Sequence, residues 1–278
     1  MQIKNEIKTN GFRFKKNLGQ NFLEDDGILS GIVDSAGVTE ADEVLEIGAG
    51  AGTLTRALAG KAKRVFSYEI DRSLLPILER TLAGADNAEV IFKDFMRADM
   101  REVESDFAGE YIVVANLPYY ITSPIVMRLL EEGTRVKRIV VTVQKEVADR
   151  FCSESGTPDY GAITVAINAL GSARKVMDIP REMFYPAPNV DSAVVRIDVD
   201  REKFGDLDYP SLRKVVRAAF SSRRKTLANN LMLSFKMTRS DAEKALSEAG
   251  ADVSVRGEKL SVEDFIKLAK VLKTKKVL

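Results

Sequence analysis

The sequence predicts an α/β fold with a parallel sheet in its first 200 residues and a small helical domain after them. Short apolar runs alternate with helix-like segments between residues 44 and 143, which is the pattern of βαβ units. A Gly-rich segment, residues 48–52, directly follows the first of these runs. Strand-like runs stop after residue 199, and the later segments have the apolar spacing of amphipathic helices.

The elements follow from this pattern in chain order. The expected strands are residues 44–47, 64–69, 89–92, 111–115, 138–143, 175–179 and 192–199. The expected helices of the first domain are residues 53–59, 73–82, 124–131 and 161–170, and residues 181–189 are expected to form a Pro-containing loop. The expected helices of the second domain are residues 212–220, 226–233, 240–249 and 262–272. Ser240 and Ser261 are the expected N-caps, because Glu243 and Asp264 follow three residues later as cap partners. The domains are therefore expected at 1–200 and 201–278.

The composition excludes several kinds of chemistry. The 278 residues include one cysteine, Cys152, and no histidine, so no intrachain disulfide can form and we expect no metal site. No apolar run reaches the roughly 20 residues of a membrane helix, and the first 16 residues lack the apolar core of a signal peptide. We therefore expect a cytoplasmic protein without a membrane partner. Nothing indicates an obligate interface, so we expect a monomer.

The net charge of +1 conceals an uneven distribution of charge. Residues 201–278 contain 18 Lys and Arg against 10 Asp and Glu, and residues 1–20 contain five basic residues and one acidic residue. The compensating acidic excess lies between these segments. Basic ends around an acidic middle indicate a polyanion bound at the ends, although runs of charge also occur on solvated helix faces.

The Gly-rich segment predicts a ligand site. Residues 46–52 read Glu-Ile-Gly-Ala-Gly-Ala-Gly, between an expected strand and an expected helix. Glycines at this place allow a tight turn and a close approach of the backbone to a ligand. The spacing is GxGxG and not the GxGxxG of dinucleotide enzymes, which favours a methyl donor over a nicotinamide cofactor. A purely structural turn is the alternative.

Two carboxylates lie at the ends of the next two expected strands. Glu69 follows Gly48 by 21 residues, and Asp94 follows Glu69 by 25 residues. An acid at the first position accepts hydrogen bonds from ribose hydroxyls in Rossmann-like sites, and ligands bind at the carboxyl ends of strands in open α/β sheets. Each acid alone is better explained as a surface or capping residue, but their placement at consecutive strand ends favours a ligand site.

The fourth expected strand ends in Asn-Leu-Pro-Tyr-Tyr at residues 116–120. The amine of an adenine has its lone pair delocalised into the ring, and acceptors that hold its hydrogens can aim that lone pair at a methyl carbon. The side-chain oxygen of Asn116 is one such acceptor, and the carbonyl of Pro118 is the expected second. Tyr119 offers a flat face for the base. An ordinary turn with core tyrosines is the alternative.

Together these motifs resemble the class I methyltransferases that act on amino groups, and specifically the ribosomal RNA adenine dimethyltransferase family. Four further segments resemble signatures of that family: residues 16–23 (Lys-Asn-Leu-Gly-Gln-Asn-Phe-Leu), 144–148 (Gln-Lys-Glu-Val-Ala), 184–192 (Phe-Tyr-Pro-Ala-Pro-Asn-Val-Asp-Ser) and 219–227 (Ala-Phe-Ser-Ser-Arg-Arg-Lys-Thr-Leu). The resemblance implies a Rossmann-like sheet with helices on both faces, a helical C-terminal domain that binds RNA, and S-adenosylmethionine as cofactor.

The resemblance also implies roles for individual residues. It places the donor against Gln20, Asn21, Leu23, Gly48, Gly50, Glu69, Asp94 and Asn116. Within this set, Glu69 would hold the ribose and Asp94 the adenine amine. At the target side, Asn116 and Pro118 would bind the target amine, Tyr119 would stack on the ring, and Phe184 would cover its other face. Adenine inside a duplex is out of reach, so the target must be single-stranded or flipped out.

The second domain would hold the RNA. The resemblance implies that Arg223, Arg224 and Lys225 grip phosphates, which position RNA without reading its sequence. At the other end of the chain, residues 1–20 would either close over the same strand or form a flexible basic arm; the residues concerned are Arg13, Lys15 and Lys16.

Four functions remain open at this point. The first is dimethylation of two adjacent adenosines near the 3′ end of small-subunit ribosomal RNA, either free or in a pre-assembled subunit. The second is methylation of large-subunit RNA that confers antibiotic resistance. The third is a ribosome-assembly factor without catalysis, and the fourth is a dinucleotide oxidoreductase. The Leu-Pro-Tyr-Tyr form and the match that extends through residues 223–227 favour the first.

Overall fold

A computed structural model describes residues 14, 15 and 19–278 of the chain. The chain divides into two compact units, of which the first comprises Met1–Ala148 and Ala173–Val199 and the second comprises Asp149–Ser172 and Asp200–Leu278. The second unit therefore takes in a segment, Asp149–Ser172, that precedes the expected boundary at residue 200. Of the helices described, none combines the length and the apolar composition needed to cross a membrane.

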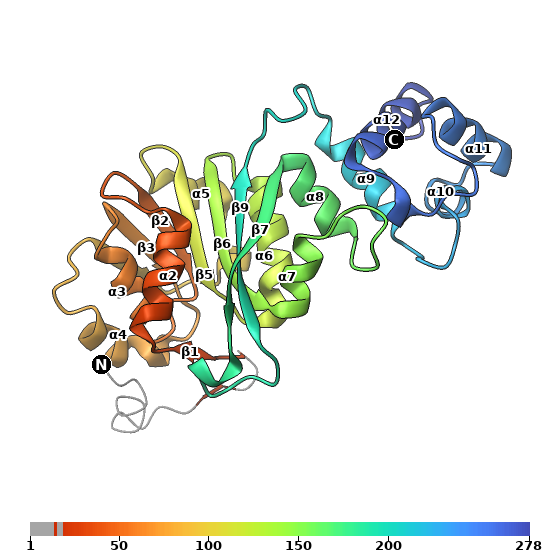
Figure 1. Cartoon of the computed structure of the whole chain (residues 1–278). Helices are drawn as coiled ribbons and strands as arrows, with labels where there is room; N and C mark the ends of the chain where they lie inside the picture. Colours follow the sequence, from red (N-terminus) through yellow and green to blue (C-terminus); the bar gives the residue numbers. More distant parts are fainter. Residues whose placement is uncertain (1–13, 16–18) are drawn as a thin grey trace. The chain divides into compact units, whose positions relative to one another are not determined.

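The first unit is built on a seven-stranded mixed sheet (Figure 1). Its strands are β2 (Glu43–Ile47), β3 (Arg64–Tyr68), β4 (Ala88–Ile91), β5 (Tyr111–Asn116), β6 (Val136–Gln144), β7 (Gly171–Ile179) and β9 (Ser192–Val199). They lie in the order β4-β3-β2-β5-β6-β9-β7. Strands β2 to β6 pair in parallel, and β9 pairs antiparallel to β6. The predicted α/β fold is confirmed, and the late strand β9 makes the sheet mixed.

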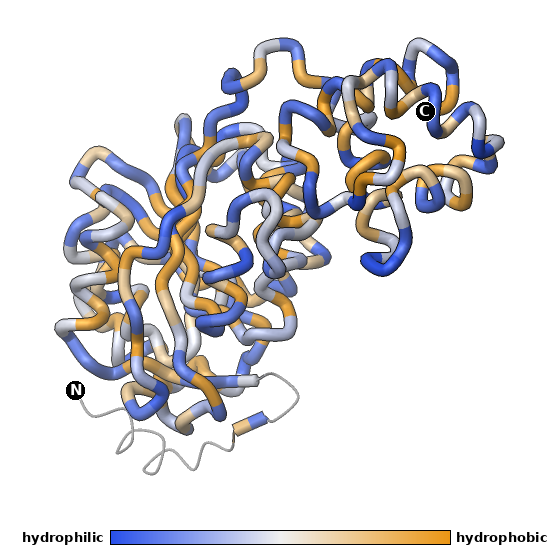
Figure 2. Tube along the Cα trace, turned by 45° about the vertical axis from the view of Figure 1, so that its right-hand side comes forward, coloured by the Kyte–Doolittle hydropathy of each residue, from blue (hydrophilic) through white to orange (hydrophobic). Residues whose placement is uncertain are grey.

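The central strands are buried on both faces and consist mainly of apolar side chains, with Glu43 and Glu46 of β2 as buried exceptions. All five residues of β2 and the first five of β5 are buried, as expected of parallel strands covered by helices on both sides. On one face, Leu29 and Leu58 belong to the same hydrophobic core as Val44, Val114 and Val140 of the sheet. Figure 2 shows the central strands as mainly hydrophobic segments and the loops between them as mainly hydrophilic.

Helices cover both faces of the sheet. They are α2 (Asp26–Ala36), α3 (Thr53–Ala59), α4 (Leu75–Thr81), α5 (Met100–Ser105) and α6 (Tyr119–Glu132), whereas α7 (Lys145–Phe151) extends from the first unit into the second. Helix α2 lies in front of the sheet in Figure 1 and α6 behind it. Helix α2 was not predicted, although Asp25 caps it by accepting a hydrogen bond from the Ile28 N–H at 2.9 Å. Gly27 and Gly31 lower the helix propensity of that segment, which obscures its apolar periodicity.

A small additional sheet joins two distant segments. Strand β1 (Phe22–Leu23) pairs antiparallel to β8 (Phe184–Tyr185), within the region that the sequence predicted as a loop. The pairing attaches the segment after residue 19 to the segment that precedes β9. Both segments therefore reach the same edge of the first unit.

The order of the strands determines where a ligand can bind. From β2 the chain proceeds to β3 and β4 on one side, and then returns to β5 and β6 on the other side. The gap between β2 and β5 is therefore a topological switch point. Open α/β sheets bind ligands at such a point, outside the carboxyl ends of the strands.

The second unit is helical. It contains α8 (Ala162–Leu170), α9 (Tyr209–Ala219), α10 (Leu227–Phe235), α11 (Arg239–Glu248) and α12 (Val262–Thr274), packed around a common apolar core that includes Leu231 and Phe265. The predicted cap of α12 is confirmed, because Ser261 and Asp264 form a reciprocal capping box. The predicted cap of α11 is wrong: Thr238 accepts the hydrogen bond from the Asp241 N–H at 3.1 Å, and the helix begins one residue before Ser240.

Candidate active site

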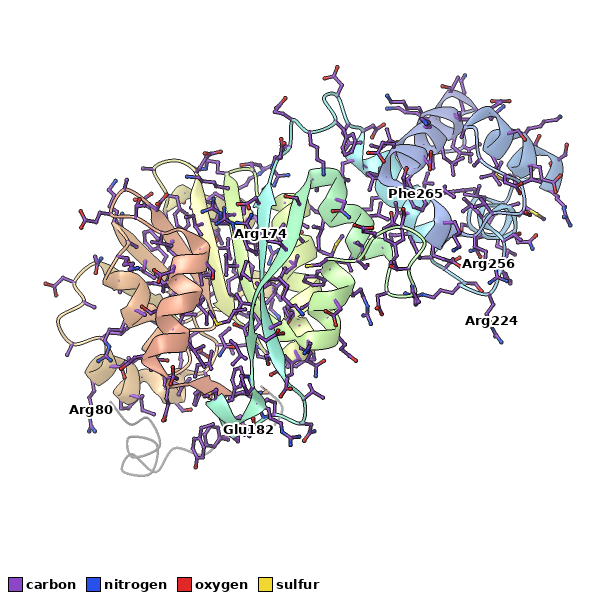
Figure 3. The ribbon with its side chains drawn as sticks, viewed as in Figure 1. Arg80, Arg174, Glu182, Arg224, Arg256 and Phe265 are labelled. Atoms are coloured by element: carbon purple, nitrogen blue, oxygen red, sulfur yellow. The ribbon has the colours of Figure 1, made fainter. Side chains whose placement is uncertain are left out.

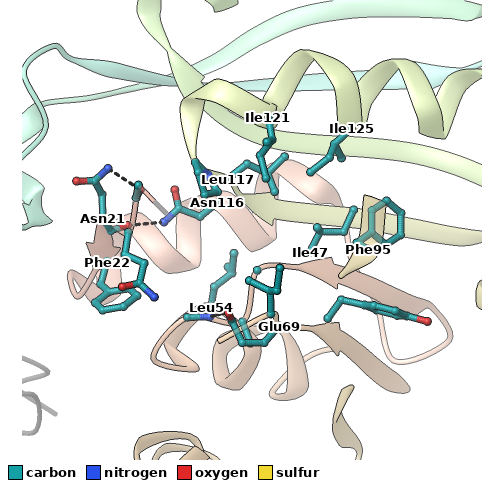
Figure 4. Close-up of a pocket in the computed structure, with 18 of the residues that line it drawn as sticks. Asn21, Phe22, Ile47, Leu54, Glu69, Phe95, Asn116, Leu117, Ile121 and Ile125 are labelled. Atoms are coloured by element: carbon teal, nitrogen blue, oxygen red, sulfur yellow. Dashed lines mark hydrogen bonds between the residues drawn. The ribbon is translucent and has the colours of Figure 1, made fainter. Parts of the chain in front are cut away.

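A pocket of about 360 Å³ lies at the switch point of the sheet (Figure 4). Its lining includes residues 19–23, 47–51, 68–70, 93–96 and 116–121. Apart from the first, these segments start at or just beyond the carboxyl ends of β2, β3, β4 and β5. The volume is within the range of pockets that bind small molecules and cofactors.

The Gly-rich loop forms the floor between β2 and α3. The N–H groups of Gly48 and Ala49 both donate to the carbonyl of Tyr68, at 2.8 and 3.2 Å, which turns the loop across the end of β3. Gly50 has a φ of +55°, and a Cβ at this position would lie 3.0 Å from the ring of Phe22. A side chain would therefore strain the backbone and displace Phe22.

Glu69 is bound to this loop by hydrogen bonds. The Gly50 N–H donates to one carboxylate oxygen and the Asp71 N–H to the other, each at 2.8 Å. Burial raises the pKa of Glu69, and these backbone hydrogen bonds oppose the rise. Each oxygen has a second lone pair that can accept a further hydrogen bond. The carboxylate thus lines the pocket in a fixed orientation and can accept two hydroxyl groups.

Asp94 both caps a helix and lines the pocket. Its side chain accepts a hydrogen bond from the Met96 N–H at 2.9 Å, at the start of the 3₁₀ helix Phe95–Arg97. It also lies among the residues that line the pocket. The capping role and the ligand role that the sequence left as alternatives are therefore compatible, because the hydrogen bond fixes the carboxylate at the pocket wall.

Two apolar side chains at the pocket were not predicted. Ile70 is 54% exposed and Met96 is 38% exposed, and both line the pocket. They follow Glu69 and Asp94 by one and two residues, so their position was readable from the same strand ends. Apolar groups beside the two carboxylates suit the faces of a flat heteroaromatic ring.

The segment around Gln20 is attached to the pocket through Asp71. Gln20 donates to one oxygen of Asp71 at 3.0 Å, and the ammonium group of Lys15 donates to the other at 2.6 Å. Burial raises the pKa of Asp71, but the hydrogen bonds from Lys15, Ser73 and Gln20 outweigh it and hold the pKa below its ordinary value. Gln20, Asn21 and Leu23 all line the pocket, whereas Arg13 and Lys16 lie outside the described residues.

Asn116 at the end of β5 is held in one orientation. Its side-chain N–H donates to the carbonyl of Asn21 at 3.1 Å (Figure 4). The amide nitrogen is therefore occupied by the protein, and the amide oxygen, for which we find no donor in residues 14, 15 and 19–278, is the free acceptor of this side chain. The structure brings Asn116 together with the Gly-rich loop, Glu69 and Asp94 in one pocket.

The expected role of the Pro118 carbonyl does not fit the structure. Pro118 is the N-cap residue of α6, and its carbonyl accepts hydrogen bonds from the Ile121 N–H at 3.1 Å and from the Thr122 hydroxyl at 3.2 Å. Both lone pairs are thus used within the first turn of the helix. Leu117 also lines the pocket, and its carbonyl accepts no hydrogen bond from the part of the chain described. Leu117 therefore replaces Pro118 as the second candidate acceptor.

Tyr119 is held by a contact that was not predicted. Its hydroxyl lies 2.7 Å from the hydroxyl of Ser192, the first residue of β9. Ser192 is fully buried, and burial raises the pKa of Tyr119 despite this hydrogen bond. The ring lines the pocket with its hydroxyl attached to the sheet. The serine that ends the 184–192 signature thus has a physical role in fixing the tyrosine.

Phe184 lies elsewhere than expected. It is 4% exposed and belongs to the same hydrophobic core as Leu23 and Leu29, and it is not among the residues that line the pocket. Its pairing with Leu23 in the small sheet buries the ring. In this structure Phe184 therefore supports the pocket wall and does not present a face to a base.

Within the second unit, the three residues of the basic cluster differ in their contacts with the protein. All three side chains of the cluster, Arg223, Arg224 and Lys225, are exposed. Arg223 donates to the carbonyls of Pro158 and Tyr160, at 3.0 and 3.5 Å, and so anchors a neighbouring loop. Arg224 projects outward from the unit (Figure 3). Arg224 and Lys225 are thus the members of the cluster that remain available to an anion.

Comparisons with known proteins show which family the chain is similar to. Residues 11–274 match the family model described as ribosomal RNA adenine dimethylase. A ribosomal RNA small subunit methyltransferase A from Bacillus licheniformis is 47% identical, over 97% of this chain and 94% of that protein. Among solved structures, a dimethyladenosine transferase from Plasmodium falciparum is similar with a TM-score of 0.76 at 26% identity, covering 92% of this chain and 98% of that one. The 23S rRNA methyltransferase ErmE is similar with a TM-score of 0.68 at 30% identity, covering 91% of this chain and 100% of that one.

The family model spans nearly the whole chain, and the Bacillus relative matches over almost its full length. The match includes both units and every segment that lines the pocket. The chain therefore belongs to the ribosomal RNA adenine dimethylase family.

Proposed function

We propose that this protein transfers methyl groups from S-adenosylmethionine to the exocyclic amines of two adjacent adenosines near the 3′ end of small-subunit ribosomal RNA, during biogenesis of that subunit. The observation that carries the proposal is the pocket in which the Gly-rich loop, Glu69 and Asp94 meet Asn116 and Leu117. One half of this pocket suits a nucleoside, and the other half suits an amine.

The donor would occupy the half formed by the first three strand ends. The carboxylate of Glu69 is oriented to accept the ribose hydroxyls, and that of Asp94 can accept the adenine amine. Ile70 and Met96 supply apolar surface for the adenine ring. Gly48 and Gly50 leave room for the backbone to pass beneath the donor. When bound, S-adenosylmethionine supplies the electrophilic methyl group.

The target amine would lie between Asn116 and Leu117. The amide oxygen of Asn116 and the carbonyl of Leu117 can each accept one N–H of the amine. In the first transfer, holding both hydrogens draws the lone pair out of conjugation with the ring and directs it toward the donor. In the second transfer, the monomethylated amine has one N–H left for these acceptors. The Tyr119 ring, fixed through Ser192, offers a face on which the base can stack. Neither acceptor is a base, so this arrangement acts by orientation.

The choice of the small subunit is supported by the relatives. The Bacillus protein at 47% identity is named for the small subunit, whereas ErmE, at 30% identity, is named for 23S rRNA. The intact polar groups of the pocket support catalysis over an assembly factor that only binds RNA. Arg224 and Lys225 would contact phosphates. The proposal includes that the protein is a monomer and acts in the cytoplasm, where its substrate is assembled.

The experiment is methyl transfer to small ribosomal subunits isolated from cells that lack this gene. Labelled S-adenosylmethionine is added with the purified protein, and digested RNA is analysed for dimethyladenosine and its position. Two adjacent dimethylated adenosines near the 3′ end are expected. Modification of large-subunit RNA alone would overturn the proposal, and tight particle binding with zero turnover would support the assembly factor. Thermal stabilisation by a nicotinamide dinucleotide would support the oxidoreductase.

A further inference from the structure

Two consecutive tyrosines at the start of α6 have opposite surroundings. Tyr119 is half-buried, and its hydroxyl is bound to Ser192. Tyr120 is 61% exposed, which makes it one of the most exposed large hydrophobic side chains of the described residues, and it also lines the pocket. We find no hydrogen bond to its hydroxyl from residues 14, 15 and 19–278. The folded chain therefore fixes one ring and leaves the next one open at the same site.

The open ring has a defined position. A Cβ at Gly19 would lie 3.6 Å from the ring of Tyr120 and 3.3 Å from Pro118, so the backbone of Gly19 packs beside the ring. Gly19 has a φ of +56°, which a residue with a side chain rarely adopts. A tyrosine also has few rotatable bonds, so it loses little conformational entropy when a ligand packs against it. The ring is thus a supported, solvent-exposed aromatic surface.

The substrate supplies a partner for this surface. If the proposed function holds, the target adenine enters the pocket and stacks on Tyr119, while its neighbour in the strand stays outside. Tyr119 and Tyr120 both line the pocket, so the exposed ring of Tyr120 is available to a base that lies beside the one held by Tyr119. An unstacked base next to a flipped base loses one stacking partner, and an aromatic side chain can replace that partner for any base.

We propose that Tyr120 is a stacking platform for the nucleobase adjacent to the target adenine, a second base-binding position of the active site. This inference rests on the proposed function and specifies how that site holds its RNA. Stacking does not depend on the identity of the base, so the platform can hold the neighbouring base when either of the two adenosines is the target. It also takes over the flanking aromatic role that the sequence assigned to Phe184, although toward the neighbouring base.

The test compares three variants of the full chain on undermethylated small ribosomal subunits: Tyr120→Ala, Tyr120→Phe and Leu75→Ala. Leu75 is the matched control, because it is 44% exposed in the same unit but does not line the pocket. We expect Tyr120→Ala to lower kcat/KM for the subunits about tenfold. Tyr120→Phe and Leu75→Ala should stay within threefold of the wild type. The KM for S-adenosylmethionine should be unchanged in all three.

Two results would overturn the inference. One is a kcat/KM of Tyr120→Ala within threefold of the wild type, and the other is an equal loss in Tyr120→Phe, which would assign the effect to the hydroxyl. These are distinct from failure of the proposed function, in which the wild-type protein itself would not methylate the subunits.

Discussion

The two halves of the pocket differ in how the protein uses their polar groups. The donor half is formed by Gln20, Gly50, Glu69 and Asp94, and its polar side chains already form hydrogen bonds within the protein. Glu69 accepts from two backbone N–H groups, Asp94 accepts from the Met96 N–H, and Gln20 donates to Asp71. In the target half, formed by residues 116–120, the amide oxygen of Asn116 and the carbonyl of Leu117 have no donor among the described residues.

This difference predicts different consequences of mutation. Groups that are fixed before the ligand arrives contribute to binding in the ground state, so their loss weakens affinity for the donor. Free acceptors that meet the reacting amine contribute most when the lone pair attacks, so their loss lowers the rate of the chemical step. Separate measurements of donor affinity and turnover therefore distinguish the two halves.

The largest effect is expected for Asn116→Ala. Removing the acceptor for the target amine should lower kcat by about 10²–10³-fold, because the lone pair is no longer held in line with the methyl carbon. Single-turnover methylation of undermethylated subunits measures the rate, and calorimetry with S-adenosylmethionine measures donor affinity. The donor Kd should stay within threefold of the wild type. Near-normal turnover would show that Asn116 does not orient the amine.

The matching change in the donor half is Glu69→Gln. The carboxylate is expected to accept two ribose hydroxyls, and hydrogen bonds to a charged acceptor contribute about 1.5–3 kcal/mol each. The donor Kd should rise about tenfold to a hundredfold, while kcat at saturating donor should change by less than threefold. A fall in kcat at unchanged donor affinity would reverse the assignment of the two halves.

The donor half was largely predictable from the sequence. The helix predicted at residues 53–59 is observed as α3, Thr53–Ala59, and the strand predicted at 64–69 is observed as β3, Arg64–Tyr68. The strand before Glu69 is largely buried and the strand before Asp94 is only partly buried, but both are short β-like runs whose ends can be located without a structure. The sequence did not predict the hydrogen bonds that connect these strand ends, such as the one from the Gly50 N–H to the Glu69 carboxylate.

The target half was predicted less well, for reasons that depend on tertiary structure. Helix α6 was expected from residue 124, at Pro124, but it begins at Tyr119, and this earlier start occupies the carbonyl of Pro118. Phe184 was expected to lie in a loop and cover the other face of the target base, but residues 184 and 185 pair with β1 and the ring is buried. The contact between Tyr119 and Ser192 spans 73 residues. Local patterns cannot specify such distant partners.

A smaller effect is expected from that contact, and a double-mutant cycle measures it. Tyr119→Phe and Ser192→Ala each remove one side of the same hydrogen bond, and a net contribution of about 1 kcal/mol predicts a loss of about fivefold in kcat/KM for the subunits. If the bond fixes the ring, the double variant should be no worse than either single variant. Multiplicative losses would mean that the two residues act independently and that the target half does not depend on this attachment.

The smallest effect on turnover is expected for substitution of Glu46. This residue precedes the Gly-rich loop of the donor half. This side chain is fully buried, and Thr55 and Ser67 both donate to one of its oxygens at 2.5 Å. The other oxygen has no partner among the described residues. Burial raises the pKa of Glu46 from 4.5 to about 8, because an ionised carboxylate with an unpaired oxygen is costly in an apolar interior.

The pH dependence of stability tests this assignment. Between pH 4.5 and about 8, the folded protein keeps a proton on Glu46 that the unfolded chain has lost. The free energy of unfolding should therefore fall as pH rises through this window, by up to about 1.4 kcal/mol per pH unit from this group, and level off above it. Glu46→Gln should remove that part of the decline. In urea unfolding at pH 5, 6.5 and 8, the free energy of unfolding of the variant should therefore rise relative to that of the wild type as pH increases. A stability difference that is constant with pH would mean that Glu46 is ionised in the folded protein, and that the donor half rests on a buried charge.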